Sequence, residues 1–210
     1  MDWKKHIINE LNELSGKYST YEIFADWVKM EALTISQRVD YKECREKEYL
    51  DVAHKYSKEE LIRISRLSGA LTLAYETEGM SDILGSIYMS KEMGSSKLGQ
   101  FFTPYHICQM MAQLQDLSEF ESNNTVVINE PSTGAGGNII AFCEHLKNKG
   151  YNYQRQVEVI AQDLDYKAVY MSYVQFSLLG IPAKVYQGDT LRCTFNEDNV
   201  FITPSMLLKI

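Results

Sequence analysis

The sequence predicts an α/β protein in which a helical N-terminal domain precedes a partial parallel sheet flanked by helices. Through the first ninety-odd residues, apolar side chains recur at spacings of three and four, which is typical of amphipathic helices. From residue 125 onward, short β-branched runs alternate with helical segments, and this order builds a parallel sheet. A small-residue hinge at Gly94–Ser96 separates the two patterns. We therefore expect one domain over residues 1–95 and a second over residues 96–210.

Three amphipathic helices are expected in the first domain, and they cover residues 2–17, 19–39 and 57–77. The first ends near Gly16. The other two begin with capping boxes, in which a serine N-cap is followed three residues later by a glutamate; the pairs are Ser19 with Glu22, and Ser57 with Glu60. We expect the apolar stripes of these helices to pack together as a core.

The second domain is expected to begin with a helix and to continue as alternating strands and helices. Thr103 is the expected cap of that first helix, and Pro104 its first residue. Strands are expected over residues 125–131, 156–165 and 183–191, and a fourth begins within residues 199–210. Helices are expected between the strands over residues 138–150 and 166–181, and each contains a glycine suited to end it.

Composition and charge disfavour several classes of protein. No apolar run is long enough to span a membrane, and the first residues do not form a secretory signal. The four cysteines are far apart and lack CxxC spacing, so we expect reduced thiols, a cytoplasmic location and no metal site. The net charge of −7 argues against unaided DNA binding, because proteins that bind DNA usually neutralise its phosphates with a basic face.

A glycine-rich stretch, EPSTGAGG at residues 130–137, follows the first strand of the expected sheet. Glycines at this point let the backbone approach a ligand closely. The spacing is not the GxGxxG of dinucleotide-binding folds, no Walker lysine follows, and Glu130 would repel a pyrophosphate. A nicotinamide-dependent oxidoreductase is therefore disfavoured.

Acidic residues end the next two strands of the expected sheet. Asp163 is placed to accept hydrogen bonds from the hydroxyls of a ribose, and Asp189 from an exocyclic amine. Together with Glu130, these carboxylates outline a site for an adenosine that carries a cationic, amino-acid-like tail. S-adenosylmethionine fits that description and is the expected cofactor.

Four segments carry a family resemblance: GQFFTP at residues 99–104, EPSTGAGG at 130–137, AQDLD at 161–165 and GDTL at 188–191. In this order they resemble motifs of the N6-adenine DNA methyltransferases. The most similar group is the methylation subunits of type I restriction-modification systems, with related phage and plasmid enzymes. The resemblance covers roughly residues 99–210 and implies a Rossmann-like, S-adenosylmethionine-dependent methyltransferase core behind a helical domain.

The resemblance also implies which residues would bind the cofactor. Phe102, Thr103 and Pro104 would line its methionine end, and the loop over residues 130–137 would wrap its amino-acid part. Asp163 would hold the ribose, and Asp189 would hold the adenine. The full set is Phe102, Thr103, Pro104, Glu130, Ser132, Thr133, Gly134, Ala135, Gly136, Gly137, Asp163, Leu164, Asp189 and Thr190.

The family's catalytic motif, Asn or Asp followed by Pro-Pro and then Tyr or Phe, ends the fourth strand and holds the flipped adenine. In this sequence that position reads Thr203, Pro204, Ser205 and Met206. Thr203 offers one hydroxyl in place of an amide oxygen. Met206 removes a base–aromatic stacking contact, which is typically worth about 1–3 kcal/mol.

Two functions are therefore expected as alternatives. The first is an S-adenosylmethionine-dependent, site-specific DNA adenine-N6 methyltransferase of restriction-modification type, or an N-terminal fragment of one. It would bind DNA with a specificity subunit or a missing C-terminal region. The second is a catalytically inactive, methyltransferase-like binding or regulatory protein that acts through a protein partner or as a homo-oligomer. The expected sheet, incomplete at its C-terminal end, is compatible with both.

Overall fold

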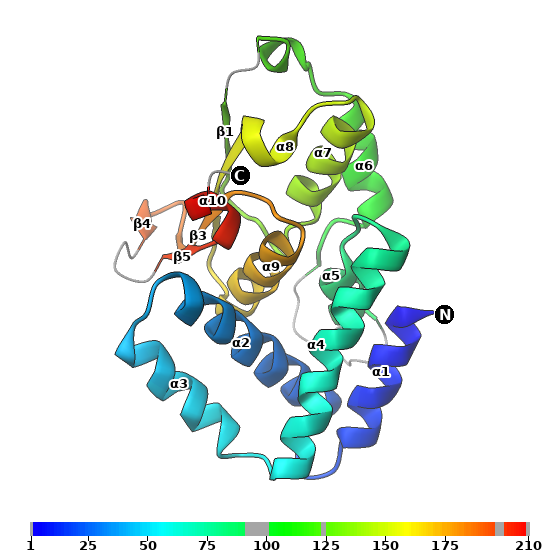
Figure 1. The fold of residues 1–210 in the computed structure, drawn as a ribbon, viewed down its shortest axis with the longest axis vertical. Coiled ribbons are helices and arrows are strands. Elements are labelled where there is room, and N and C mark those ends of the chain that lie inside the picture. Colours follow the sequence, from blue (N-terminus) through cyan, green and yellow to red (C-terminus); the bar gives the residue numbers. More distant parts are fainter. Residues whose placement is uncertain (1, 91–100, 123–124, 196–199, 209–210) are drawn as a thin grey trace.

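Helices form the N-terminal part of the chain in the computed structural model, which describes residues 2–90, 101–122, 125–195 and 200–208. These helices, coloured blue to green in Figure 1, are α1 (Trp3–Leu14), α2 (Thr20–Val39), α3 (Glu43–Ala53), α4 (Lys58–Glu78) and α5 (Ile83–Tyr88). Both capping boxes are confirmed at the starts of α2 and α4. Sequence periodicity predicts neither α3 nor α5. The expected hinge at Gly94–Ser96 lies outside the described residues.

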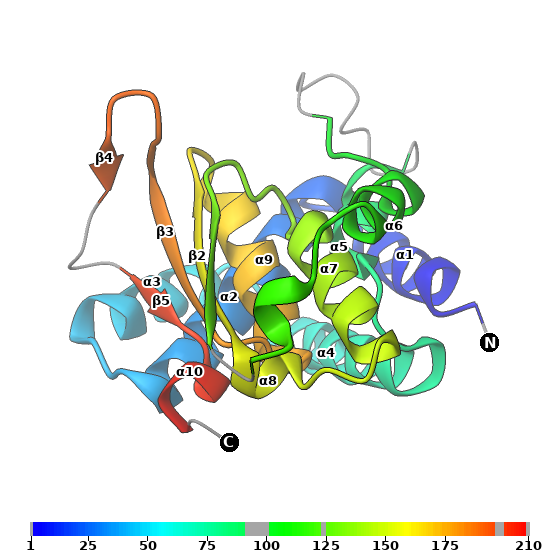
Figure 2. The ribbon, with the colours of Figure 1, turned by 90° about the horizontal axis from the view of Figure 1, so that it is seen from above.

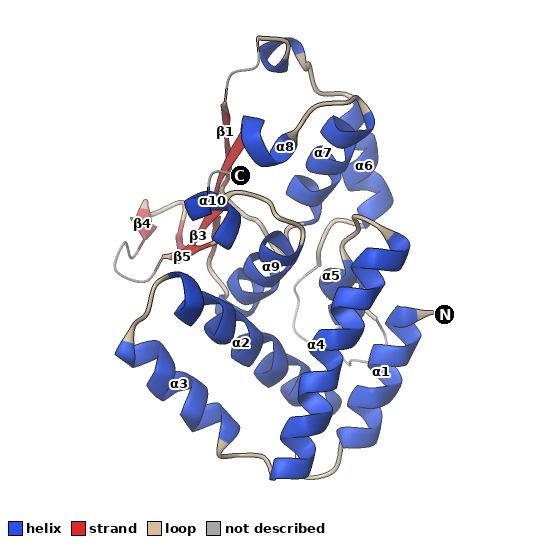
Figure 3. Ribbon diagram, viewed as in Figure 1, coloured by secondary structure: helices blue, strands red, loops and turns tan. Residues whose placement is uncertain are grey.

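Short strands alternate with helices in the rest of the chain (Figure 3). The elements are α6 (Tyr105–Gln113), a 3-10 helix (Ser118–Phe120), β1 (Val126–Glu130), α7 (Gly137–Asn148), α8 (Tyr153–Gln156), β2 (Val157–Asp163), α9 (Tyr166–Leu178), β3 (Ala183–Asp189), β4 (Thr194–Phe195), β5 (Phe201–Ile202) and α10 (Pro204–Leu208). The expected start of α6 is one residue early. Pro104 is its N-cap, because its ψ of 137° is extended, and no side chain caps the helix.

The strands β1, β2 and β3 are parallel neighbours in that order, so the predicted α/β class is confirmed. Their register pairs Glu130 with Ala161, and Asp163 with Gln187. Their carboxyl ends therefore meet at one edge of the sheet, which is at the top of Figure 2. The ends of these strands and the loops that leave this edge carry the residues expected to bind a cofactor, except Phe102, Thr103 and Pro104, which lie before α6.

The end of the sheet differs from the parallel fourth strand that the sequence predicts. The strand β5 runs antiparallel to β3, pairing Ile202 with Lys184 and Phe201 with Val185. A parallel strand needs a crossover connection of a dozen or more residues, usually a helix. The segment 190–200 is too short for that and includes β4, which also pairs with β3 in the antiparallel direction. Consequently α10 lies at the bottom of the sheet in Figure 2.

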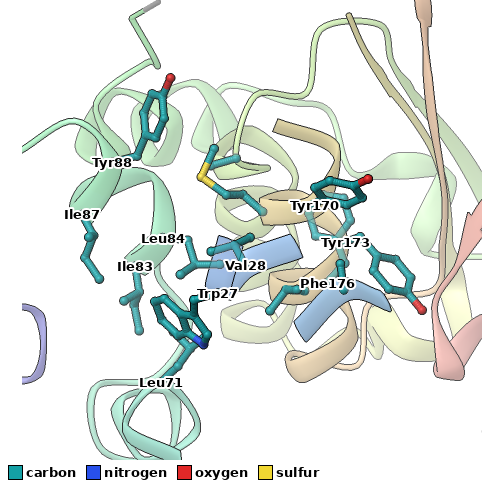
Figure 4. Close-up of a cluster of buried hydrophobic side chains, with 14 of the residues drawn as sticks. Trp27, Val28, Leu71, Ile83, Leu84, Ile87, Tyr88, Tyr170, Tyr173 and Phe176 are labelled. Carbon is teal, nitrogen blue, oxygen red and sulfur yellow. The ribbon is translucent and has the colours of Figure 1, made fainter. Parts of the chain in front are cut away.

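One continuous set of buried apolar side chains joins the helices to the sheet. In Figure 4, α2 and α4 contribute Trp27 and Leu71, α5 contributes Leu84, and α9 contributes Tyr173 and Phe176. Burying such side chains stabilises each by roughly 1.5–3 kcal/mol relative to exposure. The core therefore runs through both predicted domains and fixes α5 and α9 beside the loops of the sheet.

Within the described ranges, no helix is long and apolar enough to cross a membrane. The same ranges contain no group of three or more His, Cys, Asp or Glu side chains that could hold a metal ion.

Candidate functional site

The glycine-rich loop joins β1 to α7 at the carboxyl edge of the sheet. Gly134 and Gly136 have φ angles of 54° and 98°, which glycine adopts readily and other residues rarely do. A Cβ atom on Gly134 would lie 3.0 Å from the ring of Phe102, and one on Gly136 would lie 2.6 Å from the ring of Phe176. The loop thus needs glycine both for its backbone angles and for its close approach to two aromatic rings.

Asp163, at the end of β2, fixes the conformation of this loop. Its Oδ2 accepts a hydrogen bond of 2.9 Å from the N–H of Gly134, and its Oδ1 accepts one of 3.0 Å from the N–H of Asp165. A carboxylate has about four acceptor sites, so these two bonds leave capacity for a ligand. The predicted position of Asp163 beside the glycine loop agrees with this geometry.

A cavity of about 260 Å³ opens beside the loop. Most of the predicted cofactor residues line it, namely Phe102, Thr103, Ser132, Thr133, Gly134, Ala135, Gly137 and Asp163. The sequence analysis did not single out four further lining residues, which are Asp82, Phe101, Cys108 and Asn138. The cavity therefore brings together α5, the segment before α6, the glycine loop and the end of β2.

Two buried polar atoms in the cavity wall lack a hydrogen-bond partner among the described residues. They are Oγ1 of Thr133 and Oδ1 of Asn138. Buried polar atoms in folded proteins nearly always have a partner, which can be protein, water or ligand. Both oxygens therefore have acceptor capacity for water or for a ligand.

Several predicted cofactor residues lie outside the cavity lining. Glu130 instead supports the loop: its carboxylate accepts hydrogen bonds from the N–H of Ser132 and, at 3.3 Å, from Nδ2 of Asn138. Pro104 caps α6, Gly136 packs on Phe176, and Leu164 is 65% exposed. Glu130 lines a neighbouring cavity of about 470 Å³, which shares Asn138 and Cys108 with this one.

The end of β3 lies beside the loop but not in the cavity wall. The hydroxyl of Thr190 donates a hydrogen bond of 2.6 Å to the carbonyl oxygen of Pro131, which ties this strand end to the glycine loop. The Oδ1 of Asp189 accepts hydrogen bonds from the N–H groups of Leu191 and Arg192. Thr190 thus ties the end of β3 to the glycine loop, whereas Asp189 bonds within the turn that follows β3.

A buried polar network connects the N-terminal helices to the glycine loop. Its centre is Gln175 on α9, whose Nε2 donates to Oδ1 of Asp82 at 2.8 Å and to the carbonyl oxygen of Ala135 at 2.7 Å. Its Oε1 accepts from the N–H of Leu84 at 3.0 Å and from the hydroxyl of Tyr75. One amide therefore links α4, α5, α9 and the loop.

Asp82 is the least expected member of the site. It is the N-cap of α5 and is only 5% exposed. Burial raises the pKa of its carboxyl, and hydrogen bonds from Gln175 and Gly85 offset part of that rise. Burial, together with the charge of Asp82, also raises the pKa of the Cys108 thiol to about 11. An aspartate before a short apolar run is a helix-cap pattern, but the sequence does not reveal that this cap would be buried beside a distant loop.

The four predicted catalytic residues lie at the opposite edge of the sheet. Because β5 is antiparallel to β3, its carboxyl end lies at the amino end of β3. Thr203 is completely buried there; its Oγ1 accepts from the N–H of Ala183 at 2.8 Å and donates to the carbonyl oxygen of Ile181 at 2.9 Å. Pro204 starts α10. The structure therefore contradicts the expectation that this motif reaches the cofactor loop.

Ser205 and Met206 line a separate cavity of about 140 Å³. Thr125 before β1 and Val157 at the start of β2 line it as well. These are the amino ends of the parallel strands, away from the glycine loop. The antiparallel pairing of β5 is the physical reason for this arrangement.

A family model described as N-6 DNA Methylase matches residues 80–202, a segment that contains every residue lining the 260 Å³ cavity beside the glycine loop. No curated protein matches the sequence. The chain is similar in structure to the methyltransferase subunit of a type I restriction-modification system from Streptococcus thermophilus, with 13% identity and a TM-score of 0.46. That match covers 90% of this chain and 58% of the other, so the chain spans little more than half of that subunit's length.

Proposed function

Because the chain belongs to the N-6 DNA methylase family, we propose that it serves DNA methylation by holding S-adenosylmethionine in the cavity beside the glycine loop. The observation that carries this proposal is the chemistry of the cavity wall. It combines two carboxylates, Asp82 and Asp163, with the two buried oxygens of Thr133 and Asn138 that lack partners. Such a wall suits a ligand rich in hydrogen-bond donors and positive charge.

The residues of the cavity fit the parts of this cofactor. Asp163 keeps acceptor capacity for ribose hydroxyls, and the N–H groups at the start of α7 suit the carboxylate of an amino-acid tail. Phe102 stacks on Tyr88 with ring centroids 5.1 Å apart, which gives the cavity a rigid aromatic wall. When bound, the cofactor supplies an electrophilic methyl group. Asp189 remains our proposed partner of the adenine.

For the acceptor, we propose adenine in DNA, with base binding and DNA recognition completed by groups outside the described residues. Two observations support this division of labour. Thr203 and its neighbours lie at the opposite edge of the sheet from the cavity. The net charge of −7 disfavours DNA binding by this chain alone. A specificity subunit or a further protein segment would supply the basic surface.

A second candidate function is a methyltransferase-like binding or regulatory protein that acts through a partner or a second copy of itself. The buried position of Thr203 favours it, because a motif enclosed in the sheet edge is not free to hold a base. For both candidates we propose a reducing, cytoplasmic setting, in which the buried thiols of Cys108 and Cys143 stay free.

Transfer of a labelled methyl group to adenine-containing duplex DNA distinguishes the two candidate functions. The isolated chain is expected to transfer little or none. A methyltransferase subunit should gain activity when its specificity partner is added, whereas a regulatory protein should stay inactive and still bind the cofactor. Ordinary turnover by the isolated chain would contradict the division of labour proposed here.

A further inference from the structure

A single carboxylate oxygen in the cavity wall lacks a partner. Oδ1 of Asp82 accepts two hydrogen bonds, from the N–H of Gly85 at 2.9 Å and from Nε2 of Gln175 at 2.8 Å. No hydrogen bond from the described residues reaches Oδ2, although the side chain is 95% buried. Asp82 lines the cavity, so this oxygen has only the cavity from which to receive a donor.

The charge of Asp82 is also uncompensated. None of the ion pairs among the described residues includes it. Among the described residues, the cation that lowers its pKa is Lys4 on α1, and this effect is the smallest of those acting on the group. A buried carboxylate without a partner is costly, so it is normally paired or neutralised.

The surrounding backbone is built closely around this carboxylate. A Cβ atom on Gly85 would clash with both carboxylate oxygens, and one on Gly137 would lie 3.2 Å from Oδ2. Glycine at both positions therefore leaves room for the carboxylate between α5 and the start of α7. The amide of Gln175 restrains the carboxylate further, because its Nε2 donates a hydrogen bond to Oδ1.

We propose that Asp82 binds the α-ammonium group of the cofactor's methionine tail. The inference rests on the proposed function and names the group that recognises the cationic end of the ligand. Glu130 is the sequence-based candidate for this role, but it does not line this cavity and instead lines a neighbouring one of about 470 Å³. Asp82 is the carboxylate in the cavity wall that retains an unengaged oxygen and lacks a counter-charge.

The test compares two ligands that differ in one group. S-adenosylhomocysteine carries the ammonium, and its deaminated analogue carries hydrogen instead; both are titrated into the full chain by calorimetry. The wild-type chain is expected to bind S-adenosylhomocysteine at least tenfold more tightly than the analogue. In Asp82→Asn this preference should disappear, with the affinity for the analogue unchanged within twofold. Asparagine keeps an oxygen for the bonds from Gly85 and Gln175, so the fold should be retained.

Two further variants make the result specific to Asp82. Asp51→Asn removes an exposed carboxylate on α3 and should leave both affinities unchanged. Glu130→Gln should retain the preference for the ammonium-bearing ligand, and it provides the decisive comparison if Asp82→Asn does not fold. Loss of the preference in Glu130→Gln, or equal binding of both ligands by the wild-type chain, would overturn the inference. A wild-type chain that binds neither ligand would instead contradict the proposed function.

Discussion

At the scale of single residues, Asp82 combines a cost in stability with the binding role that we propose for it. Its pKa is raised above the ordinary value of 3.8, chiefly by burial. The Asp82 carboxyl therefore binds a proton more readily in the folded chain than in the unfolded chain. At pH values above the raised pKa, the charged carboxylate lowers the stability of the ligand-free protein. Lowering the pH through that raised pKa toward 3.8 removes the penalty.

Asp82→Asn should therefore raise the unfolding free energy of the ligand-free protein at pH 7.5. Each unit of pKa shift corresponds to about 1.4 kcal/mol. For a chain of this size, each kcal/mol raises Tm by about 2–4 °C. The gain over wild type should shrink as the pH falls toward 4, when the wild-type carboxyl becomes neutral. Thermal melts of both proteins across this pH range provide the measurement, and a gain independent of pH would contradict the assignment.

The loop glycine Gly136 is a second residue with a specific requirement. Gly136→Ala forces a side chain into a φ of 98° and against the ring of Phe176, and we expect a loss of about 2–4 kcal/mol. Gly69→Ala is the matched control, because Gly69 lies inside α4 with open space around it. It should stabilise the protein by about 0.5–1 kcal/mol. Urea unfolding measures both, and equal effects would show that the loop does not need glycine.

At the scale of elements, local signals explain which parts of the fold the sequence predicts. Both capping boxes and the glycines after α7 and α9 are short-range features, and they place helix ends well. The helix α3 escapes prediction because its sequence, ECREKEYLDVA, has few apolar residues, and α5 because it is only six residues long. The direction in which β5 pairs depends on the tertiary contacts of a two-residue strand, which no local pattern specifies.

Local signals also predict part of the candidate site, whereas the parts that depend on long-range contacts cannot be predicted from the sequence. Glycine spacing and the acidic end of β2 lead to the loop and to Asp163, which line one cavity in the structure. Asp82 and Gln175 were missed because their importance comes from contacts between segments about ninety residues apart. The position of Thr203 does not follow from the motif, because the family pattern implies a parallel fourth strand, whereas β5 is antiparallel to β3.

Thr203→Val tests this correction at the edge of the sheet. The variant keeps the shape of the side chain but removes the hydroxyl that bonds to Ala183 and Ile181, so the buried backbone groups lose a partner. We expect a loss of about 1–3 kcal/mol in unfolding free energy. The affinity for S-adenosylhomocysteine should stay within twofold of wild type. A tenfold weaker affinity at unchanged stability would place Thr203 in the cofactor site after all.

At the scale of the whole molecule, the helices and the sheet share one buried core and one polar network. Tyr75 on α4 and Asp82 before α5 both bond to Gln175 on α9, and Trp27 packs in the same core. The division into residues 1–95 and 96–210 rests on the change of pattern in the sequence and stays a prediction. It does not require that the two parts fold independently. Their shared core favours a single cooperative unit.

Cooperative unfolding is the prediction that follows for the whole chain. The fluorescence of Trp3 and Trp27 reports on α1 and α2, whereas far-ultraviolet circular dichroism reports on all helices. Both signals should change at the same urea concentration, and S-adenosylhomocysteine should raise that midpoint equally for both. Two separated transitions, with only the later one sensitive to the ligand, would show that the helical part folds independently of the sheet.

The central claim is that the cavity between α5 and the glycine loop holds S-adenosylmethionine. Calorimetric titration of the well-folded, full chain with this cofactor tests the claim most directly. We predict saturable binding at one site per chain, weakened at least tenfold by Asp163→Ala and unaffected by Asp51→Asn. The absence of binding at millimolar cofactor would contradict it.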